Sequence, residues 1–275
     1  MCRTLKGGPG VGGGMAEYNE VYGRAKYYDI AFRRDVTREV DFLSELYQRH
    51  AGKPLSSMID IACGPGYHAL LFSQRGVRTV GLDLRPEMVE FGRELAVAKG
   101  VDVEWMAADM RTFKLDKPVD LALTSYDSLD CLLDQDSIVA HFRAIANNLT
   151  PKGLYVFEMT NPRDCSLWDY GEFRYTGKAN GVSVEIIWRP DHSHVDILNQ
   201  VTDMEVEMRV NDNGREQVFR DRASERFALP QEYIALAKLS GALNFVTFYG
   251  DFRFDQPFDN SPGSRRLIGV LQKAG

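Results

Sequence analysis

The sequence lacks several features that mark well-known classes of protein. Its four cysteines include no CxxC pair, which disfavours both a zinc site and a disulfide framework. No apolar run reaches the roughly 18 residues of a membrane span. Basic residues are in the minority and the net charge is −6, which disfavours a protein that grips nucleic-acid phosphates. We therefore expect a cytoplasmic protein with no metal, no membrane contact and no nucleic-acid partner; a homo-oligomer is compatible with the sequence.

What the sequence contains is the composition of an ordinary globular protein. Of its 275 residues, 44% are hydrophobic and 26% are charged, and this length suffices for one large domain with an insertion. Residues 1–14 are rich in glycine and lack an apolar signal core, so we expect a flexible N-terminal extension there. Met15 is an alternative start of the protein.

Strands and helices are predicted to alternate through the first 160 residues. Apolar runs and helical spacing of apolar side chains give the expected elements. The expected strands are 57–62, 78–83, 102–106, 119–124 and 153–159, and the expected helices are 37–50, 66–75, 86–98 and 135–148. This alternation implies right-handed crossovers and a doubly wound, mostly parallel sheet that helices cover on both faces.

The pattern changes after residue 170, where four segments are rich in β-branched and aromatic residues. The expected strands are 171–178, 182–189, 194–209 and 215–228, and the turn signals between them are Asn180-Gly181, Arg189-Pro190-Asp191 and 211–214. An antiparallel meander is therefore predicted as an insertion. The α/β pattern then resumes with a helix at 230–240 and strands at 244–249 and 266–272.

The most informative segment is 58–68, which reads MIDIACGPGYH. It predicts a short apolar strand that ends in an acid, Asp60, followed by a tight turn and the start of a helix. Gly64 and Gly66 allow backbone angles and close contacts that a β-carbon would prevent. A second apolar strand ends in Asp83, 19 residues after Gly64. Two carboxylates at successive strand ends, beside a glycine turn, indicate a nucleoside-binding crevice.

Nicotinamide-binding sheets use a similar turn, so a dehydrogenase is the alternative reading of this segment. In those sheets the glycine run begins at the strand end, without a preceding acid. Here Asp60 precedes the glycines and a third acid, Asp109, follows the third predicted strand. The positions of these acids disfavour a dehydrogenase.

The chain resembles the class I S-adenosylmethionine-dependent methyltransferases, and it is most similar to small-molecule N-methyltransferases that act on amines or amino sugars. The resemblance rests on four motifs in order: DIACGPG at 60–66, GLD at 81–83, ADM at 108–110 and PVDLALT at 118–124. It covers about residues 20–160 and 225–275. It implies a Rossmann-like, doubly wound α/β fold with a seven-stranded, mostly parallel sheet. One departure is Ala62, where the family usually has glycine.

The resemblance also implies which residues bind the cofactor, S-adenosylmethionine, whose product is S-adenosylhomocysteine. Asp60 and the glycine turn would hold its amino-acid end, Asp83 its ribose hydroxyls and Asp109 its adenine amino group. Met88 is equally well explained as a core residue, whereas for Asp109 a solvent-facing loop acid is the less favoured alternative. The residues expected to contact the cofactor are Tyr28, Asp60, Ala62, Gly64, Gly66, His68, Asp83, Leu84, Met88, Asp109, Met110 and Ser125.

Three residues are expected near the reacting methyl group. Tyr28 matches the position where related enzymes place a tyrosine over the cofactor, although the tyrosines of that segment are also explained by packing. Ser125 follows the fourth strand, where the family lines the path to the methyl group. Asp127 is expected to contact the acceptor, whereas Asp134 and Asp136 are expected to cap the helix at 135–148.

These observations predict an enzyme that moves a methyl group to a small molecule, with an amine nitrogen favoured over a hydroxyl or carbon acceptor. A protein or RNA acceptor and a non-catalytic cofactor-binding protein are the alternatives. The cofactor-binding domain is expected at 15–165 and 229–275. Residues 166–228 are expected to form the inserted β subdomain, as a substrate-side lid or an oligomer contact.

Overall fold

The computed structural model describes residues 20–165 and 171–275, so the predicted extension at 1–14 lies outside the described residues. The first half contains α1 (Ala25–Phe32), α2 (Thr37–Ala51), β1 (Ser57–Ile61), α3 (Tyr67–Gln74), β2 (Arg78–Asp83), α4 (Pro86–Lys99), β3 (Glu104–Ala107), β4 (Val119–Thr124), the 3-10 helix η1 (Ser128–Cys131), α5 (Gln135–Asn148) and β5 (Leu149–Thr160). The second half contains β6 (Phe173–Ala179), β7 (Val182–Asp196), β8 (Val201–Asp212), β9 (Arg215–Arg226), α6 (Pro230–Ser240), β10 (Leu243–Tyr249) and β11 (Arg266–Lys273).

The main sheet has seven strands in the order β10-β11-β5-β4-β1-β2-β3. Strand β1 pairs in parallel with both β2 and β4, and only the pairs of β11 with β5 and β10 are antiparallel. This confirms the predicted Rossmann-like, mostly parallel sheet. Because the chain leaves β1 in one direction across the sheet and later returns to its other side at β4, the carboxyl end of β1 is the switch point where such sheets bind ligands.

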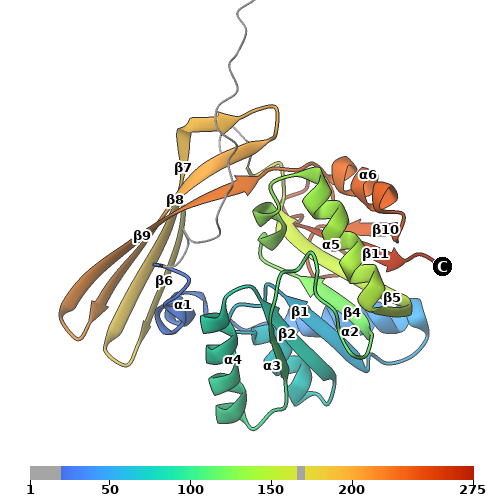
Figure 1. Cartoon of the computed structure of the whole chain (residues 1–275), viewed down its shortest axis with the longest axis horizontal. Coiled ribbons are helices and arrows are strands. Elements are labelled where there is room, and N and C mark those ends of the chain that lie inside the picture. The colour runs from blue at the N-terminus through green and yellow to red at the C-terminus, as the bar shows by residue number, and fades with distance from the viewer. Residues whose placement is uncertain (1–19, 166–170) are drawn as a thin grey trace, which may run out of the picture.

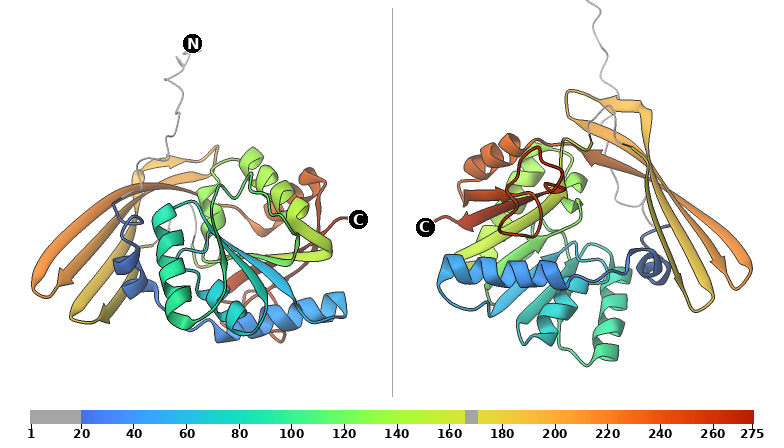
Figure 2. Two further views of the ribbon diagram at one scale, coloured as in Figure 1. Left: turned by 60° about the horizontal axis from the view of Figure 1, so that its bottom comes forward. Right: turned by 180° about the vertical axis from the view of Figure 1, so that it is seen from behind.

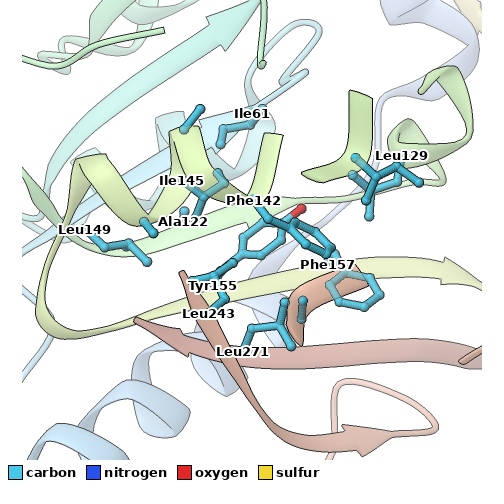
Figure 3. Close-up of a cluster of buried hydrophobic side chains, with 14 of the residues drawn as sticks. Ile61, Ala122, Leu129, Phe142, Ile145, Leu149, Tyr155, Phe157, Leu243 and Leu271 are labelled. Atoms are coloured by element: carbon cyan, nitrogen blue, oxygen red, sulfur yellow. The ribbon is translucent and has the colours of Figure 1, made fainter. Parts of the chain in front are cut away.

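Helices cover both faces of this sheet because its strands are apolar on both sides. Strands β1 and β4 are buried along their whole length. Helices α2 and α3 pack on one face, with Leu43 and Phe72 among the buried residues. Helices α5 and α6 pack on the other face, where Phe142, Tyr155 and Phe157 are fully buried (Figure 3). No helix among the described residues is long and apolar enough to cross a membrane.

The second sheet is the predicted antiparallel meander, in the order β6-β7-β8-β9, and it projects from the α/β layers as a separate wing (Figure 1). The turn predicted at Arg189-Pro190-Asp191 is wrong. Strand β7 continues to Asp196, and Pro190 pairs with Met204 on β8. The neighbouring strand β6 pairs with β7 only as far as Trp188, so among the described residues Pro190 has a strand partner on one side only, where a strand tolerates proline.

Helix α1 lies between the meander and the α/β layers (Figures 1 and 2). A β-carbon on Gly177 of β6 would lie 1.7 Å from the carbonyl oxygen of Ile30, so only glycine lets the helix backbone approach this closely. On the other side, buried Asp29 accepts a hydrogen bond of 2.8 Å from the Tyr67 hydroxyl of α3. Helix α1 therefore connects the meander directly to the turn that follows β1.

Candidate cofactor and methyl-transfer site

The turn after β1 has three residues in the left-handed region of backbone angles. Gly64 and Gly66 have φ values of 54° and 78°, which glycine adopts without strain. Ala62 has a φ of 52°, although it carries a β-carbon. The turn therefore keeps the left-handed conformation at the position where the family usually has glycine, and it does so at the cost of roughly 1–2 kcal/mol.

Three glycines pack against the indole ring of Trp105 of β3, a role that sequence reasoning missed. Added β-carbons on Gly66, Gly81 and Gly92 would lie 2.5, 2.6 and 2.4 Å from atoms of its indole ring. These three glycines come from the start of α3, from β2 and from α4, so the ring fills the space where these elements meet. Gly66 is therefore required by core packing, independently of any ligand.

Among the described carboxylates Asp60 is unusual because it is buried and incompletely paired. It is the last residue but one of β1, its Oδ2 accepts a hydrogen bond of 3.3 Å from the Ala69 N–H, and its Oδ1 has no hydrogen-bond partner among the described residues. Burial raises the pKa of Asp60 to about 6, although the charges of His68 and Arg34 act in the opposite direction. A buried acceptor without a partner indicates a position for a ligand donor.

Asp83 lies at the end of β2, next to the same turn. Its two oxygens accept hydrogen bonds from the backbone N–H groups of Gly64 at 2.8 Å and Arg85 at 2.9 Å. Burial raises the pKa of Asp83, and these N–H donors partly offset the effect. Each oxygen keeps a lone pair for a further donor such as a hydroxyl group. Leu84, the next residue, is 41% exposed and offers an apolar surface beside the carboxylate.

The third acid, Asp109, follows β3, and its side chain is held by Arg111, two residues further along the chain. Its carboxylate accepts hydrogen bonds from the Arg111 guanidinium at 2.6 to 3.0 Å, and the ion pair lowers its pKa. The Met110 carbonyl lies 2.9 Å from Nδ1 of His141, whose burial lowers its pKa to about 4. His141 is therefore neutral and structural.

Met88 is 1% exposed and packs in the interior, as its core interpretation predicted.

Tyr28 lies where the sequence places it, beside the turn. A β-carbon on Gly64 would lie 4.0 Å from Cε1 of Tyr28, and the charge of Asp83 contributes to raising the tyrosine's pKa after the larger effect of burial. The ring stacks on Phe32, with centroids 4.3 Å apart. Its neighbour Tyr27 points elsewhere, since its hydroxyl donates a 3.0 Å hydrogen bond to Asp212 of the meander.

Arg34, which lies between α1 and α2, belongs to this site. Its guanidinium is 3.3 Å from Glu39 and lies 4.6 Å above the Tyr126 ring. Its charge also lowers the pKa values of Asp60 and Tyr28 relative to the effect of burial alone. No motif in the sequence marks this arginine. Its place depends on how the segment between α1 and α2 passes the turn.

The structure gives His68, expected to contact the cofactor, a partner within the protein. His68 is buried, and its Nε2 makes a short hydrogen bond with Glu39 of α2. Burial alone would raise the pKa of Glu39, but this bond and the charges of His68 and Arg34 hold it below its usual range. The histidine therefore supports the side of the turn that faces α2, and its charge acts on Asp60 from there.

Asp127, in the segment after β4, has partners within the protein. Its carboxylate accepts hydrogen bonds from the backbone N–H and hydroxyl of Thr160 and from the Arg266 guanidinium at 2.9 Å. These partners join the end of β4 to β5 and β11, and contact of Asp127 with the acceptor stays a prediction. Ser125 is half-buried, and its carbonyl accepts a hydrogen bond from the Ser128 hydroxyl. Asp134 caps α5, as predicted, by accepting the Ser137 N–H at 2.6 Å.

Residues 58–153 match a family model described as a methyltransferase domain. This segment is a methyltransferase domain. Its boundaries enclose β1 to β4 with Asp60, Asp83, Asp109 and the turn between them, so the motifs that carried the resemblance are also those that the family model matches. S-adenosylmethionine is the methyl donor of the family, as the sequence resemblance implied.

Two curated relatives extend the match beyond this methyltransferase domain. "Putative methyltransferase YqeM" of Bacillus subtilis is 26% identical over 103 residues, which is 37% of this chain and 41% of the relative. The "dTDP-3-amino-3,4,6-trideoxy-alpha-D-glucopyranose N,N-dimethyltransferase" of Streptomyces venezuelae is 25% identical over 199 residues, which is 70% of this chain and 77% of the relative. The chain thus spans about two fifths of the first relative and about three quarters of the second.

Solved structures share the fold of the whole chain. A S-adenosylmethionine-dependent methyltransferase from Clostridium acetobutylicum has a TM-score of 0.74 at 19% identity, covering 92% of this chain and 98% of its own. CalS10, described as an amino pentose methyltransferase from Micromonospora echinaspora, has a TM-score of 0.66 at 20% identity, covering 92% and 96%. At these identities the likeness shows the fold.

The residues around the turn after β1 fit S-adenosylmethionine. The unpaired Oδ1 of Asp60 suits the ammonium group of the methionine moiety, and Asp83 has lone pairs free for ribose hydroxyls. The backbone N–H groups at the start of α3 and the Arg34 guanidinium suit its carboxylate. Among the described residues no group of three or more His, Cys, Asp or Glu side chains could hold a metal ion.

Proposed function

We propose that the protein transfers a methyl group from S-adenosylmethionine to an amine nitrogen of a small molecule, and that this amine is carried by a nucleotide-linked sugar. The match to the Streptomyces venezuelae N,N-dimethyltransferase carries the proposal, because it extends over 70% of the chain, well beyond the methyltransferase domain. Two further relatives, each 28% identical over about half of the chain, are also named as N,N-dimethyltransferases of dTDP-amino sugars.

In this proposal the residues around the turn hold and orient the cofactor. Asp60 pairs with the ammonium, Arg34 with the carboxylate, and Asp83 with the ribose. Leu84, Met110 and Asp109 surround the adenine, with the Asp109 carboxylate held in place by Arg111. Tyr28 and Ser125 border the path to the methyl group. Ala62 and Gly64 contact the cofactor through the backbone of the turn.

The bound cofactor supplies an activated methyl group: the amine lone pair forms the new N–C bond while the C–S bond breaks, its electrons stay on sulfur, and the product ammonium then releases a proton to solvent. The chain's own contribution is to align the acceptor for in-line attack and to exclude water. Aspartates near the acceptor are not free to act as bases, since Asp127 is bound to Arg266 and Thr160. Positioning therefore carries most of the catalysis.

The proposal assigns the α/β layers, residues 15–165 and 229–275, to cofactor binding and the insertion at 166–228 to the acceptor side. The inner face of the meander packs on α1, and its last strand β9 lies against η1, close to the cofactor turn. Its outer face carries a ladder of ion pairs, from Arg174 with Glu185 to Arg209 with Glu207. Such a charged face favours the lid interpretation over an apolar oligomer contact. We place the enzyme in the cytoplasm, without a nucleic-acid partner.

Calorimetry and product analysis test the proposal. Purified protein should bind S-adenosylmethionine, and Asp83→Ala should weaken that binding by about tenfold or more. Incubation with a dTDP-3-amino sugar should yield S-adenosylhomocysteine together with the N-methylated sugar. If S-adenosylmethionine binds but no amine is methylated, a hydroxyl or carboxyl acceptor or a non-catalytic binding role takes the place of this proposal. If no cofactor binds, the functional assignment is wrong.

A further inference from the structure

Two adjacent residues after β4 are held in a backbone conformation that side chains disfavour. Tyr126 and Asp127 have φ values of 60° and 61°, and neither is glycine. Consecutive left-handed residues persist only where the surrounding structure holds them, and such residues concentrate at functional sites. The position is the carboxyl end of β4, which is the immediate neighbour of β1 in the sheet.

The surroundings hold this pair through two carboxylates and one arginine. Glu158 accepts the Tyr126 N–H with its side chain at 3.0 Å and the Asp127 N–H with its carbonyl at 3.2 Å. Arg266 binds both acids, with Nη2 at 2.9 Å from Asp127 and Nε at 2.9 Å from Glu158. Strands β5 and β11 therefore fix the direction in which the Tyr126 side chain leaves the backbone.

The Tyr126 ring points into the space between α1 and the meander. It meets Phe32 of α1 edge-on at 5.8 Å and lies 5.9 Å from the ring of Tyr175 on β6. Two guanidinium groups lie near the same ring, Arg34 at 4.6 Å and Arg266 at 6.0 Å. Tyr126 is half-buried among these groups.

We propose that the phenol oxygen of Tyr126 accepts an N–H of the acceptor amine and so aims the nitrogen lone pair at the donor methyl group. This inference rests on the proposed function, because it requires an amine acceptor. A neutral amine can give an N–H to the tyrosine and keep its lone pair for the new N–C bond, whereas an ammonium group has no lone pair to give. The C–S electrons remain on sulfur, and the extra proton leaves the product nitrogen for solvent.

The charged groups around Tyr126 are paired with one another. Arg34 pairs with Glu39, and Arg266 pairs with Asp127 and Glu158. Burial raises the pKa of Tyr126, so its phenol stays protonated and does not become an anion that would attract the ammonium form.

Steady-state kinetics with dTDP-3-amino-3,4,6-trideoxyglucose and S-adenosylmethionine test this assignment. Tyr126→Phe should lower kcat/KM for the sugar about tenfold, with the calorimetric Kd for S-adenosylmethionine within twofold of wild type. Tyr175→Phe is the matched control, because it removes the phenol oxygen of the neighbouring tyrosine and leaves the Tyr126 oxygen in place. Its kcat/KM should stay within about threefold of wild type. Tyr47→Phe, at a buried tyrosine bonded to Asp120, should leave kcat/KM unchanged.

The outcomes separate this inference from the proposed function. An active wild type with an unchanged Tyr126→Phe variant overturns the role of Tyr126 and leaves the enzyme assignment intact. Equal losses in Tyr126→Phe and Tyr175→Phe also overturn it, because the Tyr126 oxygen would then matter no more than that of its neighbour. If wild-type protein binds S-adenosylmethionine but methylates no amine, the proposed function fails and the role of Tyr126 fails with it.

Discussion

Replacing Asp60 by asparagine should make the protein more stable relative to wild type as the pH rises from 5 to 7. The pKa of Asp60 is raised from 3.8 to about 6, chiefly by burial. The folded state therefore binds a proton that the unfolded state has already lost between pH 4 and 6, and the free energy of unfolding falls as pH rises through this range. At pH 7 the buried carboxylate costs about 3 kcal/mol, and at pH 5 it costs about 1.5 kcal/mol.

Asparagine carries no charge, so Asp60→Asn removes this penalty but leaves an amide N–H₂ without a partner, at a cost of about 1–3 kcal/mol. That cost is the same at both pH values and cancels in the comparison. The stability of the variant relative to wild type should therefore rise by about 1.3 kcal/mol between pH 5 and pH 7. For a domain of this size the difference corresponds to about 3 °C in Tm.

Urea denaturation of cofactor-free protein at pH 5, 6 and 7 measures this difference. Asp120→Asn is the matched control, because Asp120 is also a buried strand aspartate but its pKa is lowered to about 2 by hydrogen bonds from Ser56, Tyr47 and Lys53 that outweigh its burial. Its stabilising effect is complete above pH 4 and is lost only as pH falls toward 2. The control should therefore be destabilised by an equal amount at pH 5 and pH 7. The same flat profile for Asp60→Asn would refute the reasoning.

The remaining predictions concern the turn, its packing and the cofactor. Ala62→Gly should raise the free energy of unfolding by about 0.5 kcal/mol in urea denaturation, because Ala62 has a φ of 52°. The control Ala69→Gly, in helix α3, should lower it by about 1 kcal/mol. A loss in Ala62→Gly similar to that in the control would contradict the strain at Ala62. Gly92→Ala should destabilise by about 2 kcal/mol, because its β-carbon would meet Trp105 at 2.4 Å; an unchanged midpoint would argue against this packing. Arg34→Met should weaken the binding of S-adenosylmethionine, measured by calorimetry, about tenfold, but should leave the affinity for decarboxylated S-adenosylmethionine unchanged. Equal losses of affinity for the two compounds would exclude a contact between Arg34 and the carboxylate. Wild-type affinity for S-adenosylmethionine should fall as pH drops below about 6, where protonated Asp60 no longer attracts the ammonium group; a flat profile would remove Asp60 from the site.

Local patterns in the sequence were sufficient for the main sheet and for much of the candidate site. Strand β4, helix α5 and helix α6 begin and end at the predicted residues, because apolar runs, an aspartate cap and a glycine stop are signals carried by neighbours in the chain. Acids at the ends of successive parallel strands must meet at one edge of the sheet, so Asp60 and Asp83 could be placed together before any coordinates existed.

Other features depended on which distant segments meet, and only the tertiary structure decided them. Pro190 reads as a turn in isolation, but it pairs with Met204 of β8 beyond the point where the described pairing of β6 with β7 ends. Asp127 looks like a free acid until Arg266, 139 residues away, pairs with it. His68 turns toward Glu39, and Arg34 passes beside the cofactor turn, because α1 is fixed between the meander and α3. The partners of a charged side chain are set by packing over long distances, so its sequence neighbours alone do not reveal its role.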